Sequence, residues 1–144
     1  MKFESTTIIN LPSATVFEVV ADFCRDPDWK NSCVSCKLIE GEGGQGSKLR
    51  YATRVLGRTH VSESIVTVYE PNARVEIEIQ GEKGGRGWRT VEPVEGGCRV
   101  TVGIEADLAR YFGPLASVLE SLGKRQGDQE LETLKVLLEH AKAA

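Results

Sequence analysis

Hydroxyl and imidazole side chains recur on two neighbouring segments of the chain that are predicted to be strands. They are Tyr51, Thr53, His60, Ser62 and Ser64. A hairpin turn at Gly57-Arg58 would turn all five toward the inner face of a sheet. Such a face is normally apolar, because a buried hydroxyl without a partner costs on the order of 1 to 3 kcal/mol. The pattern favours an apolar pocket with a few orienting groups. Hydroxyls that pair across the hairpin, or a sheet end that faces water, are the alternatives.

The histidine in this row raises the question of acid-base catalysis. Histidine side chains suit proton transfer, because their unperturbed pKa is about 6.5. His60 lies next to the predicted hairpin tip without a carboxylate to orient it, so a solvated histidine at the rim is the favoured interpretation. If the chain is catalytic, the candidates for acid, base or oxyanion-donor roles are Tyr51, His60, Ser62 and Arg89.

Two motifs have the spacing of known sites but lack the context. Gly41, Gly43 and Gly46 satisfy G-x-G-x-x-G, yet an alternating strand pattern follows where a dinucleotide site needs a helix. Cys33 and Cys36 form C-x-x-C, but positions three apart on a strand point to opposite faces. We predict a hairpin connection and reduced, structural cysteines, with no metal and no cofactor. A disulfide or a reactive thiol stays open if Cys33 still belongs to the loop.

Hydrophobic periodicity predicts one order of elements. The order is a strand over 3–10, a helix from Pro12 to about Asp22-Phe23, a helical turn over 25–30, six strands in hairpins, and a long helix from Gly113 to the C-terminus. The last two strands cover 87–94 and 98–108. A two-residue loop between them turns Arg89 and Val91 inward, whereas a three-residue loop turns Trp88 and Thr90 inward.

The terminal helix carries a leucine stripe with two glycines in it. The stripe runs through Leu115, Val118, Leu119, Leu122, Leu131, Leu134, Leu137 and Leu138. Gly123 and Gly127 each cost roughly 1 kcal/mol relative to alanine. The simple explanation for the two glycines is close packing against a neighbour or a bend in the helix. The more specific explanation is that they leave empty space beneath the helix, which would then cover a ligand cavity. On the second explanation, Gly127→Leu is expected to leave the fold intact and to reduce ligand capacity.

Composition limits the class of protein. The 144 residues carry a net charge of −3 without a basic block, which argues against nucleic acid or an anionic membrane as the main partner. No apolar run approaches the roughly 18 residues of a membrane span, and no signal core begins the chain. We therefore expect one α+β domain over 1–144, cytoplasmic, without integral membrane association. The sequence leaves open whether it is a monomer or a homodimer.

The order of elements and the residues at their joints resemble the START-like (SRPBCC) helix-grip superfamily, in its polyketide cyclase/dehydrase and lipid-transport branch. The matching residues are Ile9-Asn10-Leu11-Pro12, Phe17, Asp22-Phe23, Trp29, Glu70-Pro71, Gly96-Gly97 and the leucine-rich terminal helix. The resemblance implies a seven-stranded antiparallel sheet wrapped around that helix, with a cavity for an apolar ligand. It does not imply one function, since hydrolases, cyclases, lipid carriers and hormone sensors share the fold.

Three hypotheses follow. The leading one is a protein that binds or transports an apolar small molecule, such as a lipid, a polyketide or an isoprenoid. Its expected ligand-binding residues are Trp29, Leu49, Tyr51, Thr53, Ser62, Ser64, Val66, Ile77, Val91, Val102, Leu119, Gly123, Gln126 and Gly127. The second is an aromatase/cyclase or dehydratase, which requires at least two of the catalytic candidates to converge. The third is an interaction module, which predicts a filled cavity and an exposed apolar patch.

Overall fold

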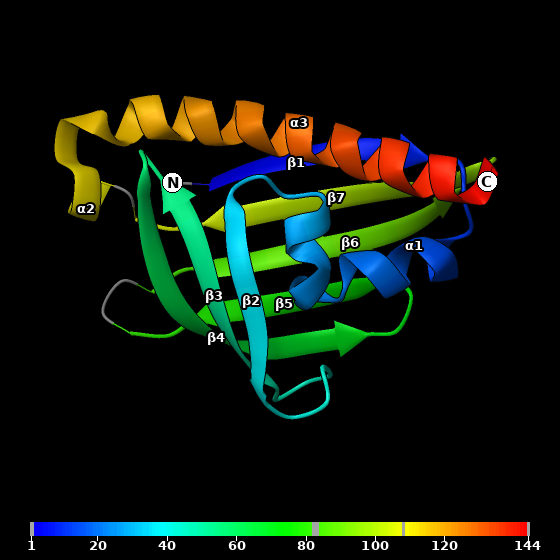
Figure 1. The fold of residues 1–144 in the computed structure, drawn as a ribbon, viewed down its shortest axis with the longest axis horizontal. Coiled ribbons are helices and arrows are strands. Elements are labelled where there is room, and N and C mark those ends of the chain that lie inside the picture. Colours follow the sequence, from blue (N-terminus) through cyan, green and yellow to red (C-terminus); the bar gives the residue numbers. More distant parts are fainter. Residues whose placement is uncertain (1, 82–83, 108, 144) are drawn as a thin grey trace.

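The computed structural model describes residues 2–81, 84–107 and 109–143. Its seven strands form one antiparallel sheet in the order β1-β7-β6-β5-β4-β3-β2. They are β1 (Lys2–Ile9), β2 (Cys33–Glu40), β3 (Lys48–Val55), β4 (Arg58–Glu70), β5 (Arg74–Ile79), β6 (Arg86–Val94) and β7 (Gly97–Glu105). The sheet curves strongly, so that β2 passes in front of the central strands in Figure 1.

The described helices lie at two places along the chain, between β1 and β2 and after β7. They are α1 (Ser13–Val20), the 3-10 helix η1 (Phe23–Asp28), α2 (Ala109–Phe112), the 3-10 turn η2 (Gly113–Leu115) and α3 (Ala116–Ala143). Figure 1 shows α3 running alongside β1, which it contacts over much of that strand. The predicted α+β helix-grip fold is confirmed. The short α2 was not predicted, and the last strand ends earlier than expected, while Leu108 lies outside the described residues.

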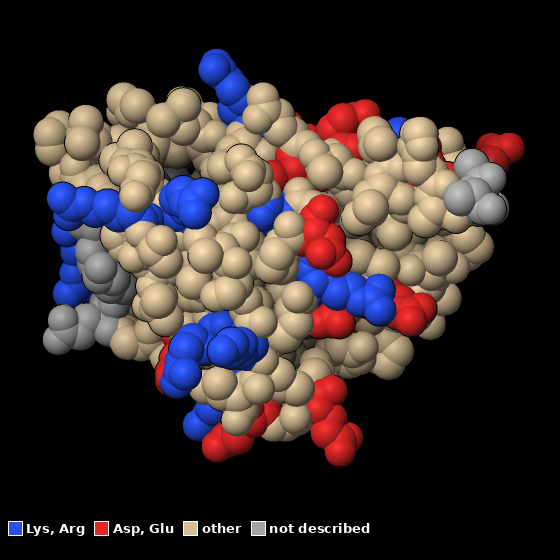
Figure 2. Space-filling model, viewed as in Figure 1, with Lys and Arg blue, Asp and Glu red and all other residues tan. Residues whose placement is uncertain are grey.

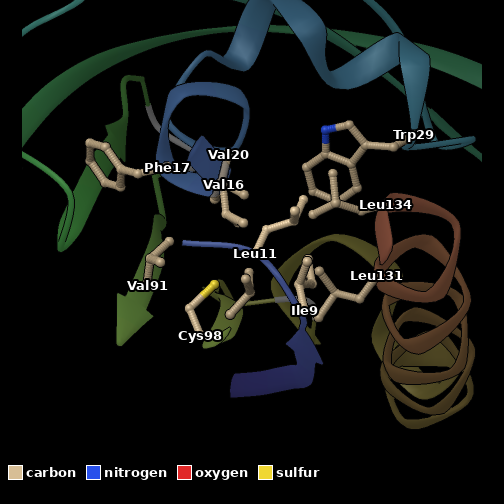
Figure 3. Packing of buried hydrophobic residues seen from close by; sticks show 11 residues of the cluster. Ile9, Leu11, Val16, Phe17, Val20, Trp29, Val91, Cys98, Leu131 and Leu134 are labelled. Atoms are coloured by element: carbon tan, nitrogen blue, oxygen red, sulfur yellow. The ribbon is translucent and has the colours of Figure 1, made fainter. Parts of the chain in front are cut away.

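The main core lies between α1, the C-terminal half of α3 and strands β1, β6 and β7. Its buried members are Ile9, Leu11, Val16, Phe17, Val20, Trp29, Val91, Cys98, Val100, Leu131 and Leu134. Figure 3 shows the side chains of α1 and α3 meeting over Leu11, with Trp29 beside Leu134. Pro12, with φ −60° and ψ 146°, begins α1 and turns its apolar face toward this cluster. The core therefore fills one end of the curved sheet.

The β3–β4 hairpin turns one residue earlier than predicted. Its loop is Leu56-Gly57, both with positive φ (50° and 76°), as a two-residue turn of this hand requires. Val55 therefore pairs with Arg58, and Tyr51 pairs with Ser62 instead of Ser64. The register shifts by two residues, and an even shift keeps every side chain on its predicted face.

Two bulges and one loop determine which side chains of β4, β2 and β6 lie on the inner face of the sheet. On β4 a bulge lies between Val66 and Val68, so Val66 pairs with Ile77 as predicted, but Tyr69 replaces Val68 opposite Val75. On β2 a bulge lies between Cys33 and Ser35. It places Cys33 opposite Thr53 and Cys36 opposite Tyr51, so both thiols lie on the inner face and the predicted separation of the two is wrong.

The β6–β7 loop has two residues, because Val94 pairs with Gly97. Arg89 therefore lies on the inner face, and Trp88 lies on the outer one. The Trp88 ring covers Gly103, where an added Cβ would collide with it. Its Nε1 donates to Glu4 Oε2 at 2.6 Å. The Lys2 Nζ and Arg86 Cζ atoms lie 5.4 and 4.7 Å from the ring centroid. Trp88 and Arg89 are thus both buried, on opposite faces of β6.

The two glycines of α3 let the helix approach β1 closely. A Cβ at Gly123 would lie 2.8 Å from the Phe3 ring, and one at Gly127 would lie 2.7 Å from Ser5 Oγ. Close packing is therefore the confirmed explanation. The expectation for Gly127→Leu is corrected accordingly, because a leucine at this position must displace Ser5 or the helix.

The leucine stripe is buried only in the C-terminal half of α3. Leu131 and Leu134 are fully buried, whereas Leu115, Val118 and Leu122 are 54%, 54% and 46% exposed. The N-terminal half of α3 thus lies beyond the packed core, over the other end of the sheet.

Candidate functional site

A cavity of 690 Å³ lies between the inner face of the sheet and the N-terminal half of α3. Apolar side chains from five elements border it, among them Phe3, Phe23, Ile79, Ile104 and Leu122. Gly87, on the inner face of β6, leaves part of the sheet side of the cavity without a side chain. Arg54 and Arg125 also border the cavity. Figure 2 shows Lys and Arg side chains gathered near the N-terminal half of α3 and the ends of β3 and β4.

Most residues expected to bind a ligand border this cavity. They are Trp29, Tyr51, Thr53, Ser62, Ser64, Ile77, Val102, Leu119, Gly123, Gln126 and Gly127. Leu49 and Val66 instead pack with Phe23 and Val75 in a second core cluster, and Val91 belongs to the main core. Four of the five residues in the polar row predicted on β3 and β4, all except His60, therefore lie in the cavity wall. The apolar residues Leu49 and Val66 that continue the row belong to the core.

The four catalytic candidates do not form one group. His60 is exposed and lies outside the cavity wall. Tyr51, Ser62 and Arg89 border the cavity, and Ser62 is the strand partner of Tyr51. Tyr51 and Arg89 do converge, but they converge on a third residue, Asp26 of η1.

Asp26 is fully buried and receives hydrogen bonds at both carboxylate oxygens. Arg89 Nη1 donates to Oδ1 at 2.8 Å, and Arg89 Nη2 donates to Oδ2 at 2.5 Å. Tyr51 Oη donates to Oδ2 at 2.5 Å. Arg89 Nη1 also donates to the Val20 carbonyl at 2.9 Å, and its Cζ lies 3.8 Å from the Phe23 ring centroid. This bidentate geometry makes the buried charge pair tolerable.

The electrostatics of this cluster fix its protonation. Burial and the neighbouring Asp26 carboxylate raise the pKa of Tyr51. Burial acts to lower the pKa of Arg89, but Asp26 outweighs it and the pKa is raised. Tyr51 therefore stays a neutral phenol and Arg89 stays a cation. A phenol held in this state is a hydrogen-bonding group in the cavity wall, not a general base.

Sequence reasoning missed Asp26 altogether. It lies in the run Asp26-Pro27-Asp28, and nothing in that run distinguishes the buried acid from the exposed one. The winding of η1 and its packing against β2 and α1 turn Asp26 toward Tyr51 of β3 and Arg89 of β6. Arg89 was the residue that could have pointed to Asp26. A two-residue loop between β6 and β7 buries the Arg89 guanidinium, and a buried guanidinium needs a carboxylate partner.

Glu130 joins α3 to the loop before β2. Its Oε1 accepts from Lys30 Nζ at 3.0 Å, and its Oε2 accepts from the backbone N of Ser32 at 2.9 Å and from Ser32 Oγ at 2.8 Å. Glu130 is buried and borders the cavity. The carboxylate thus holds the middle of α3 against the cavity wall.

Two buried donors beside the cavity make no hydrogen bond of acceptable geometry within the part of the chain that the structure describes. They are Ser5 Oγ and Trp29 Nε1, and both residues border the cavity. Buried polar atoms are nearly always paired, so each one calls for an explanation. An indole N–H can only donate, so its missing partner must be an acceptor.

Other types of site find less support. Across residues 2–81, 84–107 and 109–143, no three His, Cys, Asp or Glu side chains come together as a metal site needs. No described helix combines the length and the hydropathy that a membrane span requires.

The comparison with protein families decides the relationship. A family model described as polyketide cyclase / dehydrase and lipid transport matches residues 1–139. The chain belongs to this family. No curated protein sequence gives a significant match.

Solved structures share the fold of this family member at low identity. The Zhui aromatase/cyclase from Streptomyces sp. R1128 is 16% identical, with 96% of this chain and 93% of that chain covered and a TM-score of 0.79. A START superfamily protein from Mycobacterium smegmatis is 17% identical, with coverages of 97% and 98% and a TM-score of 0.74. A Thermus thermophilus protein is 16% identical, with coverages of 98% and 99% and a TM-score of 0.78. At these identities the likeness concerns the fold.

Proposed function

We propose that this protein binds an apolar small molecule, such as a lipid, a polyketide or an isoprenoid, in the cavity beneath α3. The observation that carries the proposal is the cavity itself, whose 690 Å³ falls within the roughly 300 to 1,000 Å³ of small-molecule sites. Each buried CH₂ of a ligand contributes about 0.8 kcal/mol. A largely apolar cavity of this size is therefore sufficient for useful affinity.

The polar groups of the wall supply orientation. Ser62 and Ser64 lie on one strand of the cavity wall, and Ser5 Oγ and Trp29 Nε1 make no hydrogen bond of acceptable geometry among the described residues. Trp29 can only donate, so a ligand with an acceptor oxygen would satisfy it. The family description, polyketide cyclase / dehydrase and lipid transport, supports a ligand of this class. An interaction module predicts a filled cavity, which is not what this chain contains.

A cyclase or dehydratase is the second candidate, since Tyr51 and Arg89 converge beside the cavity. Against it, the Tyr51 hydroxyl proton and both terminal nitrogens of Arg89 already bind Asp26. With the bond from Nη1 to the Val20 carbonyl, three of the five N–H groups of Arg89 are already in use, so less of it is left to stabilise a transition state. Binding is therefore the better-supported function.

The test combines detection of a copurified ligand with defined probes. Native mass spectrometry of the purified protein, followed by solvent extraction, is expected to reveal an apolar molecule. Calorimetric titrations with hexadecanoate and with farnesol would then measure affinity. Burial of either probe should give a negative heat capacity change. Failure of the protein to copurify with any apolar molecule and to bind either probe would contradict the proposal.

A matched pair of variants locates the binding site. Ser62 faces the cavity, whereas its neighbour Val61 is 64% exposed on the other face of the same strand. Ser62→Trp is expected to weaken binding of the probe at least about tenfold by filling the cavity. Val61→Trp adds the same ring outside it and should leave affinity unchanged. Equal affinities in the two variants would place the ligand elsewhere.

A further inference from the structure

Cys24 and Cys36 lie in contact although they are 12 positions apart, with 3.8 Å between their sulfur atoms. Cys24 is exposed on η1, and Cys36 is half-buried on β2. The C-x-x-C motif had suggested Cys33 as the natural partner of Cys36. In the fold the sulfur that meets Cys36 comes from a different element.

The contacts that anchor η1 also hold these two sulfurs together. Asp22 Oδ1 accepts from the Cys24 backbone N at 3.1 Å and begins η1. Asp26, two residues after Cys24, binds Tyr51 and Arg89 inside the protein. Cys36 is the strand partner of the same Tyr51. The hydrogen bonds of Asp26 to Tyr51 and Arg89 thus hold η1, which carries Cys24, close to the part of the sheet that carries Cys36.

We propose that Cys24 and Cys36 form a reversible disulfide when the protein meets a hydroperoxide. The Cys24 thiolate attacks the outer peroxide oxygen, so the O–O bond breaks, the alkoxide or hydroxide leaves and takes a proton, and Cys24 becomes a sulfenic acid. The Cys36 sulfur then attacks the Cys24 sulfur, and the hydroxyl leaves as water with the Cys36 proton. Two thiols are oxidised by two electrons, and the peroxide is reduced to an alcohol or water.

The positions of the two residues give each one its role. Cys24 is exposed, so the oxidant reaches it first. Burial raises the pKa of the Cys36 thiol, which keeps it protonated and unreactive toward the oxidant. Once the sulfenic acid has formed beside it, proximity drives the second step. The sulfurs must close from 3.8 Å to about 2.05 Å, a movement that side-chain rotation of the exposed Cys24 can supply.

The ring so formed spans part of the cavity wall. It encloses Trp29, which borders the cavity, and Lys30 and Ser32, which hold Glu130 of α3. Oxidation would therefore cross-link η1 to β2 and restrain the segment to which the long helix is attached. Formation of this cross-link does not require a bound ligand.

The experiment uses the full chain, first reduced and then treated with a small excess of hydrogen peroxide. After free thiols are blocked with iodoacetamide, intact mass and non-reducing peptide mapping should show a monomer with a Cys24–Cys36 link. Its unfolding midpoint should rise by roughly 5 °C and return on reduction. The map is made on the unaltered chain, so it holds whether or not any variant folds.

Two variants separate the proposed pair from its neighbour. Cys36→Ser should stop at a Cys24 sulfenic acid, which dimedone traps. Cys33→Ser is the matched control, because it removes the other cysteine of the motif and should leave the cross-link intact. A Cys33–Cys36 link, dimers joined through Cys24 alone, or no thiol loss before irreversible oxidation would each overturn the proposal.

Discussion

At the scale of single residues, the cavity wall is organised by one buried carboxylate. Removing an ion from water costs several kcal/mol unless partners replace the lost hydration. Asp26 has such partners in Arg89 and Tyr51, which between them bind both of its oxygens. The same bonds leave Tyr51 unable to lose its proton at ordinary pH, which argues for an orienting role instead of a catalytic one.

This arrangement predicts a specific loss of stability at high pH. The pKa of Tyr51 is raised in the folded protein, while in the unfolded chain it is about 10. Above about pH 10 the unfolded state therefore binds fewer protons than the folded one, and stability falls by up to about 1.4 kcal/mol per pH unit. In Tyr51→Phe this contribution is absent. Urea unfolding at pH 8, 10, 11 and 12 should show a shallower decline for the variant.

Burial also raises the pKa values of the Cys33, Cys36 and Cys98 thiols, which adds to the decline. The contributions of Cys36 and Cys98 cancel in the comparison, because Tyr51 is not among the causes of their shifts. The Tyr51 hydroxyl lowers the pKa of Cys33, so in Tyr51→Phe this pKa rises further and offsets part of the difference. Parallel stability curves for the wild type and Tyr51→Phe would show that the phenol ionises as easily in the folded state as in the unfolded one.

How much of the site the sequence could predict depends on local register. The alternation of polar and apolar residues along β3 and β4 placed Tyr51 and Ser62 on the inner face. The two-residue error in strand pairing did not change these faces, because side chains alternate with a period of two residues. Arg89 stayed ambiguous, since a single residue of loop length decided its face. Asp26 was beyond reach, because its direction comes from the packing of η1 and from no periodicity within the sequence.

At the scale of elements, the contact between α3 and β1 sets the position of the long helix. We call this contact the seam; in it Gly123 and Gly127 of α3 meet Phe3 and Ser5 of β1. The fold and the long helix could be predicted from the leucine spacing, but the role of the two glycines could not. A glycine that roofs a hollow and one that admits a neighbouring strand look identical in a sequence. The bulge in β2 was equally invisible, and it reversed the predicted orientation of one cysteine in the motif.

The seam can be tested with a double-mutant cycle. A Cβ at Gly127 would meet Ser5 Oγ at 2.7 Å but Ser5 Cβ only at 3.6 Å. In the wild type, Gly127→Ala should therefore change the free energy of unfolding little, because the clash with Ser5 offsets the gain in helix propensity. In a Ser5→Ala background the same change should stabilise the protein by up to about 1 kcal/mol. Urea unfolding of all four proteins measures the coupling.

If Ser5 could move aside at no cost, the alanine would stabilise both backgrounds equally. Zero coupling between the two positions would thus show that the approach of Ser5 does not require a glycine at this point of the helix.

At the scale of the whole molecule, one end is packed and the other is hollow. The C-terminal half of α3 is fixed by Leu131 and Leu134 in the core and by the bonds of Glu130. Further along, Glu139 accepts from the backbone N of Asn10, and Lys135 Nζ donates to the Ile8 carbonyl. The N-terminal half covers the cavity, and two of its large apolar residues, Val118 and Leu122, are about half exposed. A ligand that fills the cavity would add contacts to this half alone.

This division predicts a gradient of hydrogen exchange along a single helix. Amides over 119–127 should exchange roughly tenfold faster than those over 131–139, because fewer buried contacts oppose local opening there. Saturation with a bound probe such as hexadecanoate should slow exchange over 119–127 and leave 131–139 unchanged. Mass spectrometry of exchanged peptides resolves the two halves.

Two variants of the helix serve as the matched comparison. Glu130→Gln weakens the attachment to Lys30 and should speed exchange over 131–139, whereas Glu132→Gln alters an exposed side chain nearby and should not. Uniform exchange along α3, unaffected by either the probe or Glu130→Gln, would mean that the helix opens as one unit. The cavity would then have to admit its ligand by another route than beneath the N-terminal half of α3.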